Sequence, residues 1–353
     1  MAIEEELIHK AMLAGGNILD DELNRNYHCE TNKMLLMMRR TQALHARGNF
    51  CWSFKLWKNG LAADAKPSKC VRVWKGNALI DNQRFRLISD YLRKVQLPYF
   101  TDFRFVEHGV RIGHTDIPAI FMDWIDGDTL TEWVPAHRNR SGELRSLADK
   151  FMRMCVKLNT LGMAHGDLCC ENILVTPAGE IKLVDYDSIY VPAMQDRFPV
   201  VTAGWDDFQH PRRSNNTVAT ARDDYFSQHV IYLSLLAYAR FSSLVPEEPE
   251  KAMLFTQADY ANGNVFAASR AYRYITQHAN RGNGEDDILL KELDVLRRAV
   301  AGSFDQVPPL EELRGGGESQ VRYVPYCVRC GYKFPGNTEK YCHRCGASRL
   351  IFK

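Results

Sequence analysis

Three polar residues in one short stretch of the chain have types and spacing suited to acid–base and metal chemistry. The segment from His165 to Asp187 reads HGDLCCENILVTPAGEIKLVDYD; it holds Asp167, then Asn172 five positions later, then Asp185 thirteen further on. A carboxylate can accept a proton, and carboxylate and amide oxygens suit Mg²⁺, which takes one or two protein oxygens plus phosphate and water. The stretch therefore predicts a general base beside two magnesium ligands.

The elements around these residues indicate how they would meet. The runs NILV and IKLVD, joined by the turn TPAGE, predict a β-hairpin. Asn172 opens one of its strands and Asp185 closes the other, so both lie at one edge, with Asp167 in the loop before it. The alternative is a polar loop beside a hairpin, in which Asp167 and Asn172 are turn residues.

A second candidate site lies in the cysteine-rich tail, in the motifs CVRCG and CHRCG, where eleven residues separate Cys330 from Cys342. The two motifs supply four thiols: Cys327, Cys330, Cys342 and Cys345. Four thiolates suit tetrahedral Zn²⁺ and leave no open coordination position, so the tail resembles a zinc ribbon with a structural metal. Disulfides are the alternative, but ten cysteines without an export signal favour a reducing compartment and metal binding.

The rest of the sequence predicts a small sheet followed by helices. The runs FCWSFKLW and CVRVW predict a hairpin, residues 81–95 an amphipathic helix capped by Asp81, and residues 103–110 and 118–125 two further strands. An apolar stripe then predicts a helix that stops before Gly162, and residues 225–239, apolar almost all round, predict a buried helix. The expected fold class is α+β.

Together, the motifs HGDL, LVDYD, FQHPRR and VIYLSLLA resemble those of a bacterial protein-kinase-like family, over roughly residues 45–310. The resemblance implies a bilobal fold with a small β-sheet N-lobe and a helical C-lobe, and an ATP- and Mg²⁺-dependent phosphotransferase of the serine/threonine protein kinase type. It implies that Asp167 accepts the proton of the phosphoryl acceptor, while Asn172 and Asp185 hold Mg²⁺ on the nucleotide phosphates.

The same resemblance implies contacts to the nucleotide. FMDWI would be the last N-lobe strand running into the hinge, with Met122 as gatekeeper and the backbone of Asp123 and Ile125 facing adenine. Asp224, at the start of the buried helix, resembles the aspartate that holds the catalytic loop backbone from below.

The nucleotide-binding part departs from the family pattern. The loop that should cover the phosphates keeps only Gly48 of its glycines, and Arg72 stands where the family has a lysine on the third strand. The helix that follows carries Asp81 and Asp90 but no glutamate to pair with that cation. Gly166 replaces the arginine that often precedes the catalytic aspartate, so a phosphorylated segment at 188–210 lacks its usual anchor.

Two cysteines follow the catalytic aspartate in the same segment. Cys169 stands where serine/threonine kinases place a lysine, and we interpret it and Cys170 as packed thiols because no basic group lies beside them in the sequence.

The sequence predicts five parts. They are an N-terminal helical extension at 1–44, an N-lobe at 45–125, a C-lobe at 126–310, a glycine-rich linker at 311–322 and a zinc ribbon at 323–353. The residues of the extension indicate no function of their own.

Composition and charge restrict the partners. Of 353 residues, 45% are hydrophobic and 25% charged, which is typical of globular proteins. The longest apolar run is about ten residues, where a membrane span needs roughly 20, and the start MAIEEEL is acidic where a signal peptide is basic, so we expect a cytoplasmic protein without a membrane partner. Residues 321–353 carry a net charge of +6, whereas the whole chain carries +2, so the tail is a basic unit. Such a tail suits an acidic protein face or nucleic acid, and we favour protein docking.

Three hypotheses for the function stay open. The first is an active kinase whose acceptor is expected to be a protein; the intact set of Asp167, Asn172 and Asp185 favours it. The second, motivated by the degenerate loop and the missing glutamate, is a pseudokinase scaffold that presents the ribbon to a partner. The third is a small-molecule kinase, since HGDL is also the form found in that class.

Overall fold

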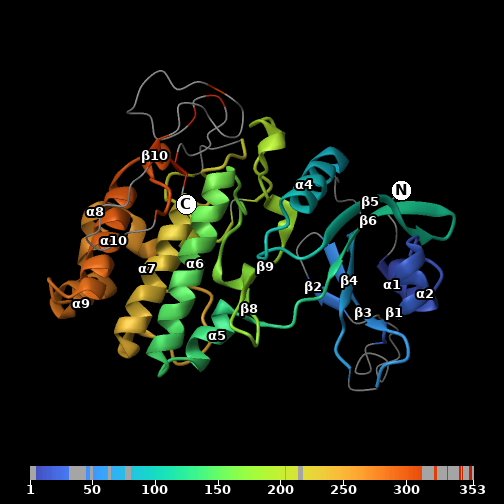
Figure 1. Ribbon diagram of the computed structural model, residues 1–353, viewed down its shortest axis with the longest axis horizontal. Helices are drawn as coiled ribbons and strands as arrows, with labels where there is room; N and C mark the ends of the chain where they lie inside the picture. Colours follow the sequence, from blue (N-terminus) through green and yellow to red (C-terminus); the bar gives the residue numbers. More distant parts are fainter. Residues whose placement is uncertain are drawn as a thin grey trace. The chain divides into compact units, whose positions relative to one another are not determined.

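In the computed structural model the chain divides into two units, Met1–Asp126 and Gly127–Lys353 (Figure 1). The first carries the larger sheet and the second the long helices. The structure describes residues 5–31, 45–47, 51–62, 65–75, 81–202, 204–213, 218–311, 322–323, 332, 342, 344 and 350–351.

The sheet of the first unit is antiparallel throughout and has the strand order β1-β3-β4-β6-β5, with β2 also paired to β3. Its strands are β1 (Tyr27–His28), β2 (His45–Arg47), β3 (Cys51–Lys58), β4 (Lys69–Trp74), β5 (Phe103–Ile112) and β6 (Thr115–Asp123). The predicted β3–β4 hairpin and the two later strands are confirmed. Because side chains alternate along a strand, each strand presents one residue set to each face.

The N-terminal segment covers one face of this sheet. Helices α1 (Glu5–Ala14) and α2 (Asp21–Asn26) contribute Ile8 and Leu23 to an apolar core with sheet residues such as Phe54, Val71 and Phe121. The sequence predicted only helices here, and the structure adds strand β1, which extends the edge of the sheet at β3. The extension is therefore part of the core of the sheet unit.

Helix α4 (Asn82–Val95) packs through its predicted apolar stripe. The ring of Phe85 lies 4.9 Å from that of Trp74 between centroids, and the hydroxyl of Ser89 donates to the carbonyl of Phe103 at 3.2 Å. The Asp81 carboxylate accepts from the backbone N–H of Arg84 at 3.0 Å, so the predicted cap is confirmed. Asp90 is exposed.

The second unit is mainly helical. Its helices are α5 (Leu130–Ala136), α6 (Ser141–Leu161), α7 (Tyr225–Arg240), α8 (Gly263–Ala268), α9 (Arg270–His278) and α10 (Gly284–Ala301). Helices α6 and α7 run side by side, and α10 contacts α7 (Figure 1). The predicted end of α6 is confirmed, since Gly162 caps it with a φ of 64°. Helix α7 is buried from Tyr225 to Tyr238, which explains its apolar sequence on every side.

Short elements connect these helices. The strands β7 (Asp128–Thr129), β8 (Ile173–Val175) and β9 (Ile181–Leu183) form a small antiparallel sheet. The 3₁₀ helices are η1 (Cys170–Asn172), η2 (Tyr186–Ser188), η3 (Pro192–Met194), η4 (Asp206–Phe208), η6 (Ser242–Leu244), η7 (Gln257–Tyr260) and η8 (Phe304–Gln306). In the tail, β10 (Arg322–Tyr323) pairs antiparallel with β11 (Leu350–Ile351).

The predicted α+β class, with a sheet part followed by a helical part, is confirmed. Among the helices in the described ranges, none combines the length and the apolar character needed to cross a bilayer.

Candidate active site

The hairpin places two of the predicted site residues at one end. Strand β8 pairs with β9 so that Ile173 faces Leu183, and the N–H of Val184 donates to the carbonyl of Asn172 at 3.0 Å. Asn172 is the last residue of η1 and Asp185 the second residue after β9, so both lie at the same edge, as predicted. The side-chain nitrogen of Asn172 donates to the backbone carbonyl of Asp167 at 2.8 Å, which ties the loop to this edge.

The carboxyl of Asp167 is half-buried, with one of its oxygens shielded from solvent. Its Oδ1 atom is buried and accepts no hydrogen bond from any residue in the described part of the chain. Burial raises the pKa of Asp167, and the carboxylates of Asp185 and Asp224 add to the rise, while His165 and Arg213 oppose it. A carboxyl with a raised pKa binds a proton more readily, which suits a general base.

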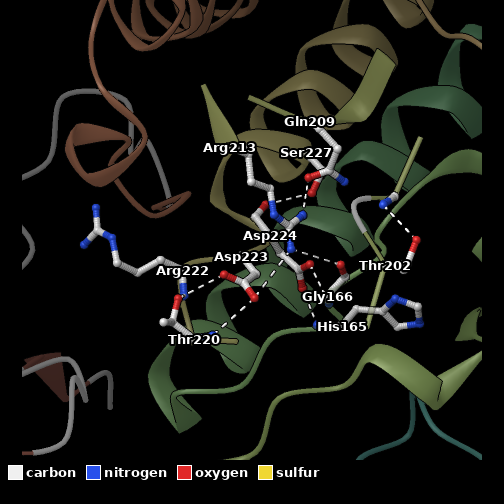
Figure 2. Close-up of polar contacts among 11 residues, drawn as sticks. His165, Gly166, Thr202, Gln209, Arg213, Thr220, Arg222, Asp223, Asp224 and Ser227 are labelled. Atoms are coloured by element: carbon white, nitrogen blue, oxygen red, sulfur yellow. Dashed lines mark hydrogen bonds and ion pairs between the residues drawn. The ribbon is translucent and has the colours of Figure 1, made fainter. Parts of the chain in front are cut away.

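The Asp224 carboxylate binds backbone N–H groups of the loop that precedes Asp167 (Figure 2). One carboxylate oxygen accepts from the N–H of Gly166 at 2.8 Å and the other from the N–H of His165 in a short contact. Asp224 is 1% exposed, and burial raises its pKa although both N–H groups oppose the rise. The resemblance predicted this support from below, and the structure contains it.

His165 links the same loop to the end of β9. Its Nε2 lies 2.8 Å from the carbonyl oxygen of Val184. Since a carbonyl only accepts, this contact assigns the proton to Nε2. The loop is therefore joined by hydrogen bonds to α7 below it and to the Asp185 segment beside it.

Gly166 and Asp185 both have left-handed backbone conformations. Gly166 has a φ of 82°, and a Cβ atom there would lie 2.2 Å from the carbonyl oxygen of Ser188. Any side chain at this position would collide with the segment after Asp185. Asp185 itself has a φ of 64°, which is uncommon for a residue other than glycine and typical of residues held in place at functional sites.

Three residues for which no role was predicted, Gly204, Gln209 and Arg213, line the same region. A Cβ atom on Gly204 would lie 2.8 Å from the Oδ1 of Asp167 and 2.5 Å from the side-chain nitrogen of Gln209, so Gly204 allows a close approach to the base. Arg213 is buried beside Gln209. The available signal was the pair Asp223-Asp224 before an apolar helix, because adjacent buried acids require a cation nearby.

The chain is similar to a serine/threonine kinase. It is 23% identical over 128 residues to the serine/threonine-protein kinase pakA of Talaromyces marneffei. The match covers 35% of this chain and 19% of that protein's length. No family model matches the chain. This partial similarity supports the predicted resemblance to protein kinases.

The cysteines beside the kinase-like loop are buried, as predicted. Burial raises the pKa of the Cys170 thiol to about 11 and that of Cys169 further. The Cys170 thiol donates to the carbonyl of Lys251 at 2.9 Å. Tyr186, between the two aspartates of the DYD motif, is fully buried and its hydroxyl donates to the carbonyl of Leu183 at 2.7 Å.

In the sheet unit, Arg72 and Met122 share one face. Arg72 lies on β4, is 5% exposed, and donates through Nε and Nη2 to the Cys51 sulfur at 3.1 and 2.7 Å. Met122 on β6 is paired with Cys70, two residues before Arg72, so alternation puts its side chain on the Arg72 face. Lys75, the nearest lysine after Arg72, lies over the ring of Trp52, which belongs to the opposite, core-facing set.

The predicted hinge follows directly from β6. The N–H of Trp124 donates to the carbonyl of Ser68 at 3.0 Å. Because successive backbone groups of a strand alternate in direction, those of Asp123, the last residue of β6, point to the opposite edge, beyond the last β5–β6 pair at Met122; Ile125 lies after the strand. The Asp123 carboxylate is bound to Lys69 at 2.6 Å, and the contact of its backbone with adenine stays a prediction.

Several predicted site residues lie outside the described part of the chain: Gly48, Cys327, Cys330 and Cys345. Cys342 is described and buried, and the zinc ribbon stays a prediction. Among the described residues, no group of three or more His, Cys, Asp or Glu side chains could hold a metal ion. The predicted magnesium ligands are an amide and a carboxylate, a pair that would need phosphate and water oxygens to complete it.

Proposed function

We propose that this chain is an ATP- and Mg²⁺-dependent phosphotransferase of the serine/threonine protein kinase type, with a protein as the phosphoryl acceptor. The observation that carries the proposal is the Asp167 carboxyl, whose buried oxygen accepts no hydrogen bond within the described residues while its loop is fixed by Asp224 and Asn172. The 23% identity to a serine/threonine kinase supports the same class.

In the proposed reaction the acceptor hydroxyl approaches Asp167. Its oxygen forms a bond to the γ-phosphorus of ATP, the bond from that phosphorus to the bridging oxygen breaks, and ADP leaves. Asp167 takes the hydroxyl proton. The raised pKa of Asp167 improves its affinity for that proton, and the fixed loop holds the carboxylate without further ordering at the moment of transfer.

Asn172 and Asp185 are the residues that would hold Mg²⁺. The amide nitrogen of Asn172 is engaged by the carbonyl of Asp167, which leaves the amide oxygen as its ligand atom. Asp185 supplies a carboxylate at the same edge of the hairpin. When bound, Mg²⁺ supplies positive charge against the nucleotide phosphates.

The test is thermal unfolding of the full chain with and without Mg·ATP. At about 100 times its Kd, the ligand should stabilise the folded protein by roughly 2.7 kcal/mol, a shift of several degrees. Asp185→Asn should lose the shift and the exposed control Asp206→Asn should keep it. Asp167→Ala should keep the shift but abolish phosphate transfer from ATP. Transfer retained in Asp167→Ala contradicts the proposed role of this residue.

A specific contact favours a second candidate, a pseudokinase scaffold with a protein partner for its tail. The Arg72 guanidinium, in the position that resembles the phosphate-binding lysine, donates twice to the Cys51 sulfur. On this hypothesis Mg·ATP produces no shift at millimolar concentration, and deletion of residues 321–353 abolishes partner binding. If Arg72 does bind phosphate, Arg72→Met should reduce the Mg·ATP shift.

A further inference from the structure

Arg213 is a buried cation against the catalytic loop. It is 5% exposed, and its Nη2 donates to the carbonyl oxygen of Gly166 at 3.3 Å. Its Nη1 donates to the side-chain oxygen of Gln209, and Nη2 lies 3.5 Å from the Asp223 carboxylate (Figure 2). The planar fork of one guanidinium thus reaches three groups at once from separate nitrogen atoms, whereas an ammonium group is a compact point charge on a single nitrogen.

The loop itself offers no place for this charge. A side chain at Gly166 would meet the Ser188 carbonyl, since even a Cβ atom would lie 2.2 Å from its oxygen. Cys169 supplies only a buried, neutral thiol. Buried carboxylates are costly without a cation. His165 opposes the rise in the pKa of Asp224, but the cation that contacts Asp223 is Arg213, which comes from another segment.

Arg213 and Asp224 hold Gly166 from its two ends. Asp224 accepts from the N–H of Gly166 at 2.8 Å, and Arg213 donates to its carbonyl. That carbonyl shares a rigid peptide plane with the N–H of Asp167, so the contact with Arg213 sets the plane that leads into the base. Gln209, bound by Arg213, also lies against Gly204, which closely approaches the Asp167 carboxyl.

We infer that Arg213 is a positioning residue for Asp167: it fixes the Gly166 peptide and the Gln209 side chain, and so holds the base in place without a charge added by modification. The kinetic part of this inference rests on the proposed function. The structural part, that Arg213 holds the Gly166 peptide in place, does not rest on the proposed function.

The test compares two adjacent arginines in the full chain. Arg213→Gln removes the buried cation. Arg212→Gln is the matched control, because Arg212 is exposed and its guanidinium donates to the carbonyls of Ala301 and Gly302. The readouts are amide hydrogen exchange of the peptide that contains Gly166, and hydrolysis of Mg·ATP with water as acceptor.

In Arg213→Gln, amide exchange at Gly166 should rise about tenfold or more. The contact with Arg213 is absent in this variant, so local opening of the loop costs less free energy. The kcat should fall by about 100-fold with the KM for ATP unchanged, as expected when a base is misplaced but substrate binding is not. Arg212→Gln should change neither quantity. Arg213→Lys should restore part of the kcat, since it keeps the charge but loses the fork.

Equal exchange and equal rates in the Arg213→Gln and Arg212→Gln proteins would overturn the inference. If Arg213→Gln does not fold, Arg213→Lys decides: Gly166 exchange and kcat at the level of Arg212→Gln would overturn it, and faster exchange with reduced kcat supports it. A parent protein that hydrolyses no ATP contradicts the proposed function, whereas Gly166 exchange still decides the structural role of Arg213.

Discussion

Different interactions stabilise the interior of each of the two units. In the sheet unit, the face covered by α1 is apolar, with Ile8 and Phe54 as examples of its buried residues. The helical unit buries carboxylates next to its loops, such as Asp223 and Asp224 beside Arg213, whereas the buried charged residues described in the sheet unit are the arginines Arg72 and Arg84. Apolar packing tolerates moderate changes in side-chain shape and holds whole elements against each other. Hydrogen bonds from buried charges instead hold individual backbone groups in place. A catalytic loop needs the second kind of restraint.

The predicted site residues follow the same division. In the helical unit, Asp167, Asn172 and Asp185 gather at one hairpin edge, and backbone hydrogen bonds hold the loop. In the sheet unit, the substitute cation Arg72 is engaged by the thiol of Cys51. The loop of the proposed base is therefore held by hydrogen bonds to its backbone, whereas the predicted phosphate contact is bound to a thiol, and the two can be tested separately.

The largest expected effect is that of Asp224→Ala. The substitution leaves the N–H groups of His165 and Gly166 buried without their acceptor, at about 1–3 kcal/mol each. We expect a loss of about 4 kcal/mol in the free energy of unfolding, measured by urea denaturation, and loss of phosphate transfer. The exposed Asp206→Ala is the control and should change stability by less than about 0.5 kcal/mol. A stable Asp224→Ala protein would show that the loop is fixed by other contacts.

The next effect tests the apolar side of the comparison. Ile8 is 1% exposed on α1, and Ile8→Ala should cost about 3 kcal/mol of unfolding free energy because a buried large-to-small change leaves a cavity. The neighbouring Leu7 is 47% exposed, so Leu7→Ala should cost little. If both variants unfold at the same urea concentration as the parent, the N-terminal extension does not contribute to the core of the sheet unit.

Features with a local signal could be predicted from the sequence. Periodicity predicted α4 with its Asp81 cap, and the turn-flanked runs predicted the hairpin that carries Asn172 and Asp185. These features depend on residues a few positions apart. Strand β1 has two residues and pairs with a strand about thirty positions later, so no periodic pattern could reveal it.

Long-range contacts made the rest of the site unpredictable. Arg213 is 47 positions from Gly166, and the sequence contains many arginines that could serve Asp223 and Asp224. The need for a cation could be predicted from the two acids, but its source depends on how the chain returns to the loop. Motif register placed Arg72 at the position of the family's lysine, but its shared face with Met122 and its contact with Cys51 depend on the pairing of β4 with β6 and with β3.

The smallest expected effect concerns a buried ion pair away from the site. The Nδ1 of His229 contacts the Glu292 carboxylate, and its Nε2 lies 2.9 Å from the carbonyl of Pro308. Both partners only accept, so both ring nitrogens carry protons and the imidazole is charged. Burial lowers the pKa of His229, but Glu292 and the Pro308 carbonyl outweigh it and raise the pKa above 6.5.

The sign of the pH dependence follows from that direction. Below pH 6.5 both the folded and the unfolded chain hold the His229 proton, and the pair contributes its full stability. As the pH rises through the folded pKa, the proton is lost and the contribution disappears, so the unfolding free energy falls. Glu292→Gln should remove this fall, measured as the difference between urea unfolding of parent and variant from pH 6 to 9. A constant difference across that range would mean that His229 is neutral in the folded protein, and that the helical unit depends less on buried charge than the comparison implies.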